Sequence, residues 1–144
     1  MIELTGHHDG HGLMERCVVR AVDEPQQPSG AYHDYRLLRA LTDEEVAAAR
    51  DGGMSYEVED GVTLADVGSV QFQRGPRNED GSTPGTLDGA LLSILIHRRE
   101  CFQAGPYACQ ENQEALDLLL GVRAMDKHRA DERAARGVLG RNAK

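Results

Sequence analysis

The sequence predicts an α+β fold, with an N-terminal antiparallel β-sheet followed by a C-terminal helical hairpin with a long last helix. Apolar and polar residues alternate with a period of two in short segments of the first half of the chain. From Thr86 onward, leucines recur at helical spacing, and Gly105-Pro106 interrupts that pattern. We expect a single domain over residues 1–144, mainly β-sheet in 1–85 and an αα-hairpin in 86–144.

Period-two alternation predicts the strands. In "ERCVVRAVDE", residues 17, 19 and 21 are apolar and point to one face, which indicates a strand. A second strand is expected from about Tyr32 to Leu41. The segment "MSYEVEDGVTLADVGSVQFQ" holds two or three more strands, and Asp60-Gly61 is a favourable tight-turn pair. Residues 1–13 are polar and rich in glycine, so we expect a mobile terminus there.

Three helices are expected. Thr42 is a suitable N-cap for a short helix with Glu45 at its third position, and Gly52 or Gly53 ends it. Thr86 is the expected cap of a second helix, whose apolar positions are Leu87, Leu91, Leu92, Leu95 and Ile96. The last helix is expected from about Cys109 to about Arg136, and Gly137 ends it. Its expected apolar positions are Leu116, Leu119, Leu120 and Met125.

Charge is distributed unevenly along the chain. The net charge of −8 argues against a protein that binds DNA or RNA. Residues 121–144 carry seven Lys/Arg against three Asp/Glu, a charge of +4, which leaves −12 for residues 1–120. A cationic C-terminal segment on an acidic body is typical of a focused anion site. Aromatic content is only 4%, so burial against a second copy would help to stabilise the chain.

The corner between the two long helices holds the first candidate site residues. Phe102 lies at the end of the first helix, where it either fills the hairpin corner or offers a flat surface on which a base stacks. Asn112 lies in the first turn of the last helix. It is either an ordinary polar first-turn residue or a partner for the N6/N7 edge of adenine, which matches one amide donor and one acceptor.

The last helix holds the other candidates. Arg129 and Arg133 are four residues apart and so share a helix face, with Arg136 one turn further. They form either a solvated charged face or a clamp for phosphates, whose oxygens match guanidinium groups bidentately. Arg36 and Arg39, near a strand end, are the cationic candidates of the sheet.

Helix geometry relates these two groups of candidates. Asn112 and Arg129 are 17 residues apart, or about 25 Å along a continuous helix at 1.5 Å per residue. No ligand of nucleotide size spans that distance. If both groups serve one ligand, they come from two chains, and a two-fold dimer then forms two equal sites.

Other chemistry has weaker support. The segment "GHHDGHG" carries three histidines and an aspartate, but it is short and terminal, so we expect no metal site. Cys101 follows His97 by one helical turn, which is a weak indication of a nucleophile and its base. No catalytic or cofactor fingerprint is present, so we expect no cofactor and no enzyme. The odd number of cysteines favours reduced thiols in a cytoplasm, and no apolar run is long enough to cross a membrane.

Three segments carry a resemblance to a known family. "GSVQFQRGPRNEDG", "LLSILIHRRECFQAGPYACQENQEAL" and "RADERAARGV", between about residues 68 and 140, resemble the phage Thoeris anti-defence proteins of the first type. The hairpin is also similar to that of the phage anti-CBASS nucleotide sponges. The segments occur in the family's order, and "FQxGPxACxEN" is long enough to be specific.

The resemblance implies a sponge rather than an enzyme. Such proteins sequester the cyclic ADP-ribose isomers made by bacterial TIR-domain enzymes, within the cytoplasm of the host bacterium. Members form dimers with the ligand at the subunit interface, and some form hexamers that also hold CBASS cyclic di- or trinucleotides at separate sites. The family's roles fall on Phe102 for stacking the adenine, on Asn112 for its edge, and on Arg129 and Arg133 for the phosphates. Two alternatives stay open for this chain: sequestration of CBASS cyclic di- or trinucleotides, instead or in addition, and an enzyme that degrades the signal.

Overall fold

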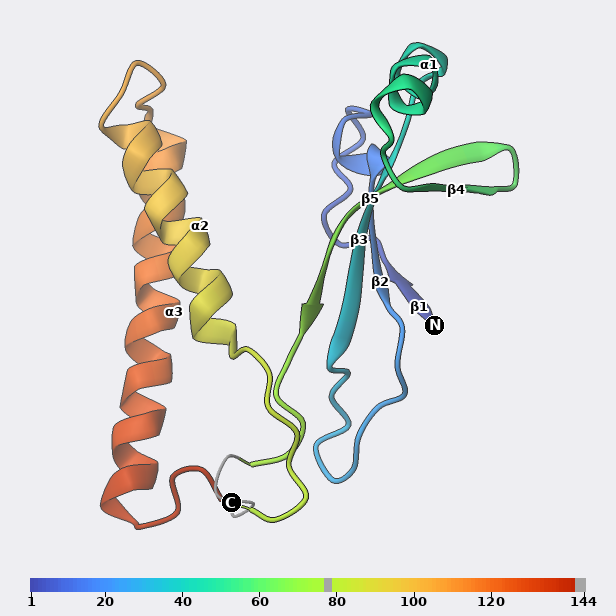
Figure 1. Ribbon diagram of the computed structural model, residues 1–144. Coiled ribbons are helices and arrows are strands. Elements are labelled where there is room, and N and C mark those ends of the chain that lie inside the picture. Colours follow the sequence, from blue (N-terminus) through green and yellow to red (C-terminus); the bar gives the residue numbers. More distant parts are fainter. Residues whose placement is uncertain (77–78, 142–144) are drawn as a thin grey trace. The chain divides into compact units, whose positions relative to one another are not determined.

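The computed structural model describes residues 1–76 and 79–141, and the chain divides into two compact units, Met1–Gln71 and Phe72–Lys144. The first unit contains the sheet and a short helix, and the second contains the two long helices (Figure 1). The sheet part was expected to reach residue 85. Residues 73 and 74 bond to residues 86 and 83, as in the hydrogen bond from Gln73 N–H to the Thr86 carbonyl, 2.9 Å. The single domain stays a prediction.

The predicted antiparallel sheet is confirmed. Within the described residues it has five strands in the order β1-β2-β3-β5-β4, and every neighbouring pair is antiparallel. The strands are β1 (Ile2–Leu4), β2 (Cys17–Ala21), β3 (Asp34–Ala40), β4 (Tyr56–Glu59) and β5 (Val62–Gln71). Asp60 and Gly61 turn between β4 and β5 with φ of 50° and 78°, the conformation that the Asp-Gly pair predicts.

The N-terminal segment is ordered, which corrects the expectation of a mobile terminus. β1 pairs with β2, and the glycine-rich segment after it closes around one carboxylate. The carboxylate of Glu15, in a 3₁₀ turn η1 (Met14–Arg16), accepts hydrogen bonds from the backbone N–H groups of Asp9, Gly10 and Gly12. The bonds from Gly10 and the other backbone groups lower the pKa of Glu15. The composition of residues 1–13 did not predict this loop, because the carboxylate that holds it belongs to Glu15, outside that segment.

One face of the sheet carries a buried cation. Arg20 on β2 is only 6% exposed, and its Nη1 lies 2.9 Å from Oε2 of Glu59 on β4. The sheet contains a bulge, where the register between β3 and β5 shifts at Leu37/Leu38. Burial alone would lower the pKa of Arg20, but hydrogen bonds to Glu59 and Glu3 raise it.

The short helix α1 (Asp43–Gly52) forms as predicted. Thr42 is the N-cap, its side chain accepts from the Glu45 N–H, and the Glu45 carboxylate accepts from the Thr42 N–H, which together form a capping box. Gly53 ends the helix at φ 69°. The buried apolar residues of this unit are Ala21, Leu38, Ala49, Leu64 and Ala65.

The second unit is the predicted helical hairpin, α2 (Asp88–Gln103) and α3 (Gln110–Ala135), lying side by side in Figure 1. Leu87, not Thr86, occupies the N-cap of α2, so the predicted cap is wrong by one residue. Thr86 instead bridges to Phe72, and its carbonyl accepts from Gln73. The last helix, α3, ends where predicted, and Gly137 follows it at φ 73°.

The hairpin buries few of its apolar side chains. Ile96 on α2 and Leu116 on α3 are buried, at 1% and 7% exposed. Met125 was expected in the same stripe but is 65% exposed, together with Leu118 and Val122 at 73% and 49%. Spacings of four and three residues place these three on one face of α3, which we call the outer stripe.

Among residues 1–76 and 79–141, no helix is both long enough and apolar enough to cross a membrane.

Candidate functional site

The corner between α2 and α3 is closed by one glutamine. The side-chain oxygen of Gln103, the last residue of α2, accepts from the Cys109 N–H at 3.0 Å. Its nitrogen donates to the Gln113 side chain at 3.3 Å. Cys109 is the N-cap of α3 and makes no side-chain cap of its own, so Gln103 supplies the acceptor that the helix start needs. The corner is therefore a defined structure and not only a break at Gly105-Pro106.

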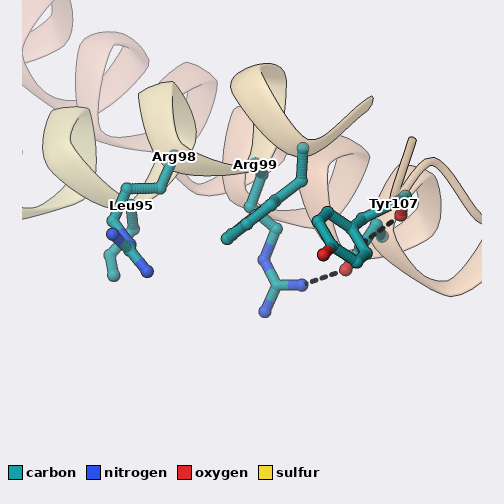
Figure 2. A pocket seen from close by; sticks show the side chains of 6 residues that line it. Leu95, Arg98, Arg99 and Tyr107 are labelled. Atoms are coloured by element: carbon teal, nitrogen blue, oxygen red, sulfur yellow. Dashed lines mark hydrogen bonds between the residues drawn. The ribbon is translucent and has the colours of Figure 1, made fainter. Parts of the chain in front are cut away.

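A cavity of about 390 Å³ lies at this corner. Such a volume falls within the range of about 300 to 1,000 Å³ that small-molecule sites occupy. Figure 2 shows the side chains gathered there, with a dashed line from the Arg99 guanidinium to a neighbouring amide oxygen. We call this space the corner cavity, and its lining residues are Leu95, Arg98, Arg99, Phe102, Tyr107 and Asn112. The structure thus brings Phe102 and Asn112 together.

The aromatic wall of the corner cavity is accessible. Phe102 is 39% exposed, so it does not simply fill the corner. The Arg98 guanidinium carbon lies 5.5 Å from the centre of the Phe102 ring, within the distance of a cation–π contact. Tyr107 is 73% exposed and adds a second ring. Exposed rings beside cations suit a ligand that combines an aromatic group with negative charge.

The Asn112 side chain has two partners within the corner. Its Oδ1 accepts from Arg99 Nη1 at 2.7 Å, and its Nδ2 donates to the Tyr107 carbonyl at 3.3 Å (dashed lines in Figure 2). Asn112 is half-buried, as is Arg99. One amide therefore ties α2 to the turn and to α3.

The two predicted phosphate ligands occupy different environments. Arg129 is exposed on α3 and lies four residues beyond Met125, so it continues the outer stripe by one turn. Arg133 is only 9% exposed, and its Nη2 donates to the carbonyls of Val138 at 3.1 Å and Arg141 at 2.7 Å. In this structure Arg133 holds the segment after α3 against the helix.

Within one chain, the structure does not bring the arginine pair to the corner cavity. α3 runs without interruption from Gln110 to Ala135, so the premise of the distance argument is confirmed. At 1.5 Å per residue, Arg129 lies about 25 Å along the helix from Asn112. Any ligand held by both residues would require two chains.

The sequence did not predict four residues of the corner cavity as site residues, namely Leu95, Arg98, Arg99 and Tyr107. A signal for the two arginines was present, because residues 95, 98, 99 and 102 follow helical spacing and so share one face. Tyr107 carried no such signal, since its position depends on the irregular turn after Gly105.

The remaining candidates are engaged elsewhere or lie apart. Arg36 pairs with Glu57 at 3.5 Å and Asp66 at 3.2 Å, and Arg39 pairs with Glu45 at 3.0 Å. Acidic partners within the sheet unit thus occupy both sheet arginines.

The histidines and cysteines give no assembled centre. His7 Nε2 lies 2.6 Å from the Cys17 carbonyl. Within the part of the chain that the structure describes, no three His, Cys, Asp or Glu side chains are grouped to hold a metal ion. Cys101 Sγ lies 3.6 Å from His97 Nε2, but both side chains are exposed and neither lines the corner cavity.

Comparison with known proteins gives a relative of known family. No family model matches the chain. The protein "Thoeris anti-defense 1" of Bacillus phage SBSphiJ7 is 30% identical over 125 residues, which cover 85% of this chain and 87% of that protein. The similarity therefore extends beyond the hairpin into the sheet unit. At that identity and coverage, the chain belongs to the Thoeris anti-defense 1 family.

Proposed function

We propose that this protein acts for a phage against the bacterial Thoeris system, by binding a cyclic ADP-ribose isomer and withholding it from its effector without cleaving it. Family membership supports the anti-defence role. The observation that carries the binding mechanism is the corner cavity, in which two rings and two guanidinium groups line a space of about 390 Å³. A cyclic ADP-ribose combines an adenine with a pyrophosphate, and those are the groups that such a wall attracts.

The proposed site is shared between two chains. Phe102 and Asn112 of one chain hold the base, and Arg129 of the second chain reaches the pyrophosphate. The exposed outer stripe supports this arrangement, because Leu118, Val122 and Met125 offer an apolar surface that leads directly to Arg129. A two-fold axis near the middle of α3 would bring each basic end to the other chain's corner. For Arg133 to act beside Arg129, it would exchange its bonds to the Val138 and Arg141 carbonyls for bonds to phosphate.

The affinity required is high, since the protein competes with an effector for a scarce signal. Nanomolar binding corresponds to about −12 kcal/mol. One stacked base supplies about 1 to 3 kcal/mol. Charge-assisted hydrogen bonds supply about 1.5 to 3 kcal/mol each. Several phosphate contacts from both chains are therefore needed, and the corner cavity alone would bind weakly.

A catalytic alternative has one specific observation in its favour, the 3.6 Å contact between Cys101 Sγ and His97 Nε2. A thiol beside an imidazole can act as a nucleophile with its base. Both groups are exposed on α2 and lie outside the lining of the corner cavity. We therefore favour sequestration.

Calorimetry followed by recovery of the ligand tests the proposal. The panel contains cyclic ADP-ribose isomers, linear ADP-ribose, and cyclic di- and trinucleotides of the CBASS type. We expect nanomolar binding of at least one cyclic ADP-ribose isomer, one molecule per chain, and return of the intact compound after the protein is denatured. A hydrolysed product would establish the catalytic alternative. If only the cyclic oligonucleotides bind, the protein sequesters CBASS signals instead. If no member of the panel gives a heat of binding, the proposed sequestration is refuted.

A further inference from the structure

We propose that Arg99 is a positioning residue that fixes the orientation of the Asn112 amide, so that the corner cavity accepts adenine and rejects its 6-oxo counterpart, hypoxanthine. This inference rests on the proposed function, because it concerns the base of the same ligand. It adds a residue that contacts Asn112 rather than the ligand, and it gives the site a basis for choosing between two bases of nearly equal shape.

Asn112 has two hydrogen-bond partners in the corner. One of them can only donate a hydrogen bond, and the other can only accept one. A guanidinium group has donors and no acceptor, so Arg99 Nη1, 2.7 Å away, requires the amide oxygen. A backbone carbonyl has acceptors and no donor, so the Tyr107 carbonyl, 3.3 Å away, requires the amide nitrogen. A flipped amide would place its NH₂ group against the guanidinium and its oxygen against the carbonyl. Both contacts would then be repulsive.

A fixed amide presents a fixed pattern to the cavity. After these two bonds, Oδ1 keeps one lone pair and Nδ2 keeps one N–H. Adenine offers a donor at N6 next to a ring-nitrogen acceptor, which matches that pattern. Hypoxanthine carries a carbonyl oxygen at the same position, and this oxygen would face Oδ1. An asparagine that was free to rotate would turn its NH₂ group toward that oxygen and keep one of its two bonds, so the fixed amide increases the discrimination.

The same two bonds also help to close the corner, and that purely structural role makes a different prediction. If Arg99 only stabilises the corner, its loss weakens every ligand by the same factor. If Arg99 fixes the amide, its loss changes the ratio of affinities for the two bases. The informative quantity is therefore the ratio of the two dissociation constants rather than either constant alone.

The experiment uses two matched ligands and the full-length protein. One is the cyclic ADP-ribose isomer that the wild-type protein binds, and the other is its hypoxanthine counterpart, made by the same cyclase from nicotinamide hypoxanthine dinucleotide. For the wild type we expect a preference for adenine on the order of tenfold to a hundredfold, the range of one bidentate base contact. Arg99→Met keeps a side chain of similar length but removes the donors, so it should lower the ratio clearly, while the Tyr107 carbonyl preserves part of the preference.

Two further variants control for stability and for charge. Arg99→Lys retains a donor without an acceptor and should keep the preference, even if both affinities fall. Arg98→Met removes a neighbouring cation of the same cavity that contacts Phe102 rather than the amide. It should weaken both ligands equally and leave the ratio unchanged. Thermal melting of each variant identifies any that does not fold, in which case Asn112→Ala replaces Arg99→Met as the variant expected to lose the preference.

The outcomes separate the inference from the proposed function. Equal binding of both ligands by the wild type would overturn the inference and leave sequestration intact. An unchanged ratio in a folded Arg99→Met protein would also overturn it, whatever the ratio in Asn112→Ala. Failure of the wild type to bind any cyclic ADP-ribose isomer would remove the proposed function and the inference together.

Discussion

Glu45 shows how much one side chain contributes to the sheet unit. Its carboxylate completes the capping box of α1 and pairs with Arg16 at 2.5 Å and with Arg39 at 3.0 Å. Partial burial would raise the pKa of this carboxyl, but the Thr42 N–H and the two guanidinium groups outweigh it, so the pKa is lowered from 4.5. A group whose pKa is lower in the folded state stabilises that state above its unfolded pKa and loses this effect as pH falls.

Glu45→Gln should therefore lower the melting temperature at pH 7 and have less effect in acid. The difference from wild type should be largest above pH 4.5 and should close as pH falls through the folded-state pKa, where the wild-type carboxyl is itself protonated. Thermal unfolding from pH 7 down to pH 3 measures it. Glu44→Gln, an exposed carboxylate of the same first turn, is the matched control. A constant difference between Glu45→Gln and wild type at all pH values would contradict the assignment.

At the scale of elements, Arg133 acts on the end of α3. The carbonyls at a helix C-terminus have no partners within the helix, and the segment that follows needs its own attachment. Arg133 is buried and donates to the carbonyls of Val138 and Arg141, so it binds that segment. Arg129, one turn earlier, is exposed. Arg129 and Arg133 were both expected to bind phosphate. Loss of Arg133 would also remove its bonds to two backbone carbonyls, whereas Arg129 is exposed.

Arg133→Ala should cost about 1.5 to 3 kcal/mol of folding stability, because bonds from a charged donor are lost. Arg129→Ala should leave the melting temperature unchanged and weaken ligand binding at least tenfold, with the oligomer intact. Denaturant unfolding, calorimetry and light scattering on both variants make the comparison. An unfolding free energy for Arg133→Ala equal to that of wild type would show that its carbonyl contacts do not hold the segment. Dissociation of the Arg129→Ala oligomer would assign that residue to the interface rather than to the ligand.

Sequence predicted the elements well where the signal was local. The change of period located both long helices, and Thr42 with Glu45 fixed the start of α1 through a capping box that spans three residues. The sequence failed where a distant group decides the conformation. Glu15 orders the glycine-rich segment, and the bonds of Thr86 to residues 72 and 73 move the start of α2. Two of the six lining residues of the corner cavity were predicted, since Phe102 and Asn112 stand out by type while Tyr107 depends on the turn.

For the molecule as a whole, the outer stripe is the main unexplained surface of the hairpin. Large apolar side chains at 49% to 73% exposure on one helix face are costly in water. Gly121 lies beside them, and a Cβ there would meet no atom within 4 Å, so a second backbone could approach closely. This combination supports the proposed pairing of two copies through α3.

Val122→Glu should separate the two chains and abolish tight binding at the same time, because a buried carboxylate without a partner opposes association. Ala124→Glu is the matched control, since residue 124 lies about 200° further around the helix and is exposed. Light scattering gives the mass, and calorimetry on the same samples gives the affinity. Full affinity in a monomeric Val122→Glu protein would refute the two-chain site.

The uninterrupted course of α3 has a consequence for how a pair of chains would fill with ligand. Because the basic turn of each chain lies at the opposite end of α3 from that chain's own corner cavity, the two shared sites, and the guests in them, would lie about 25 Å apart. That distance exceeds the Debye length of about 8 Å at physiological ionic strength, so one bound dianion would barely repel the next. Occupancy should then rise along a simple hyperbola, with a Hill coefficient of one.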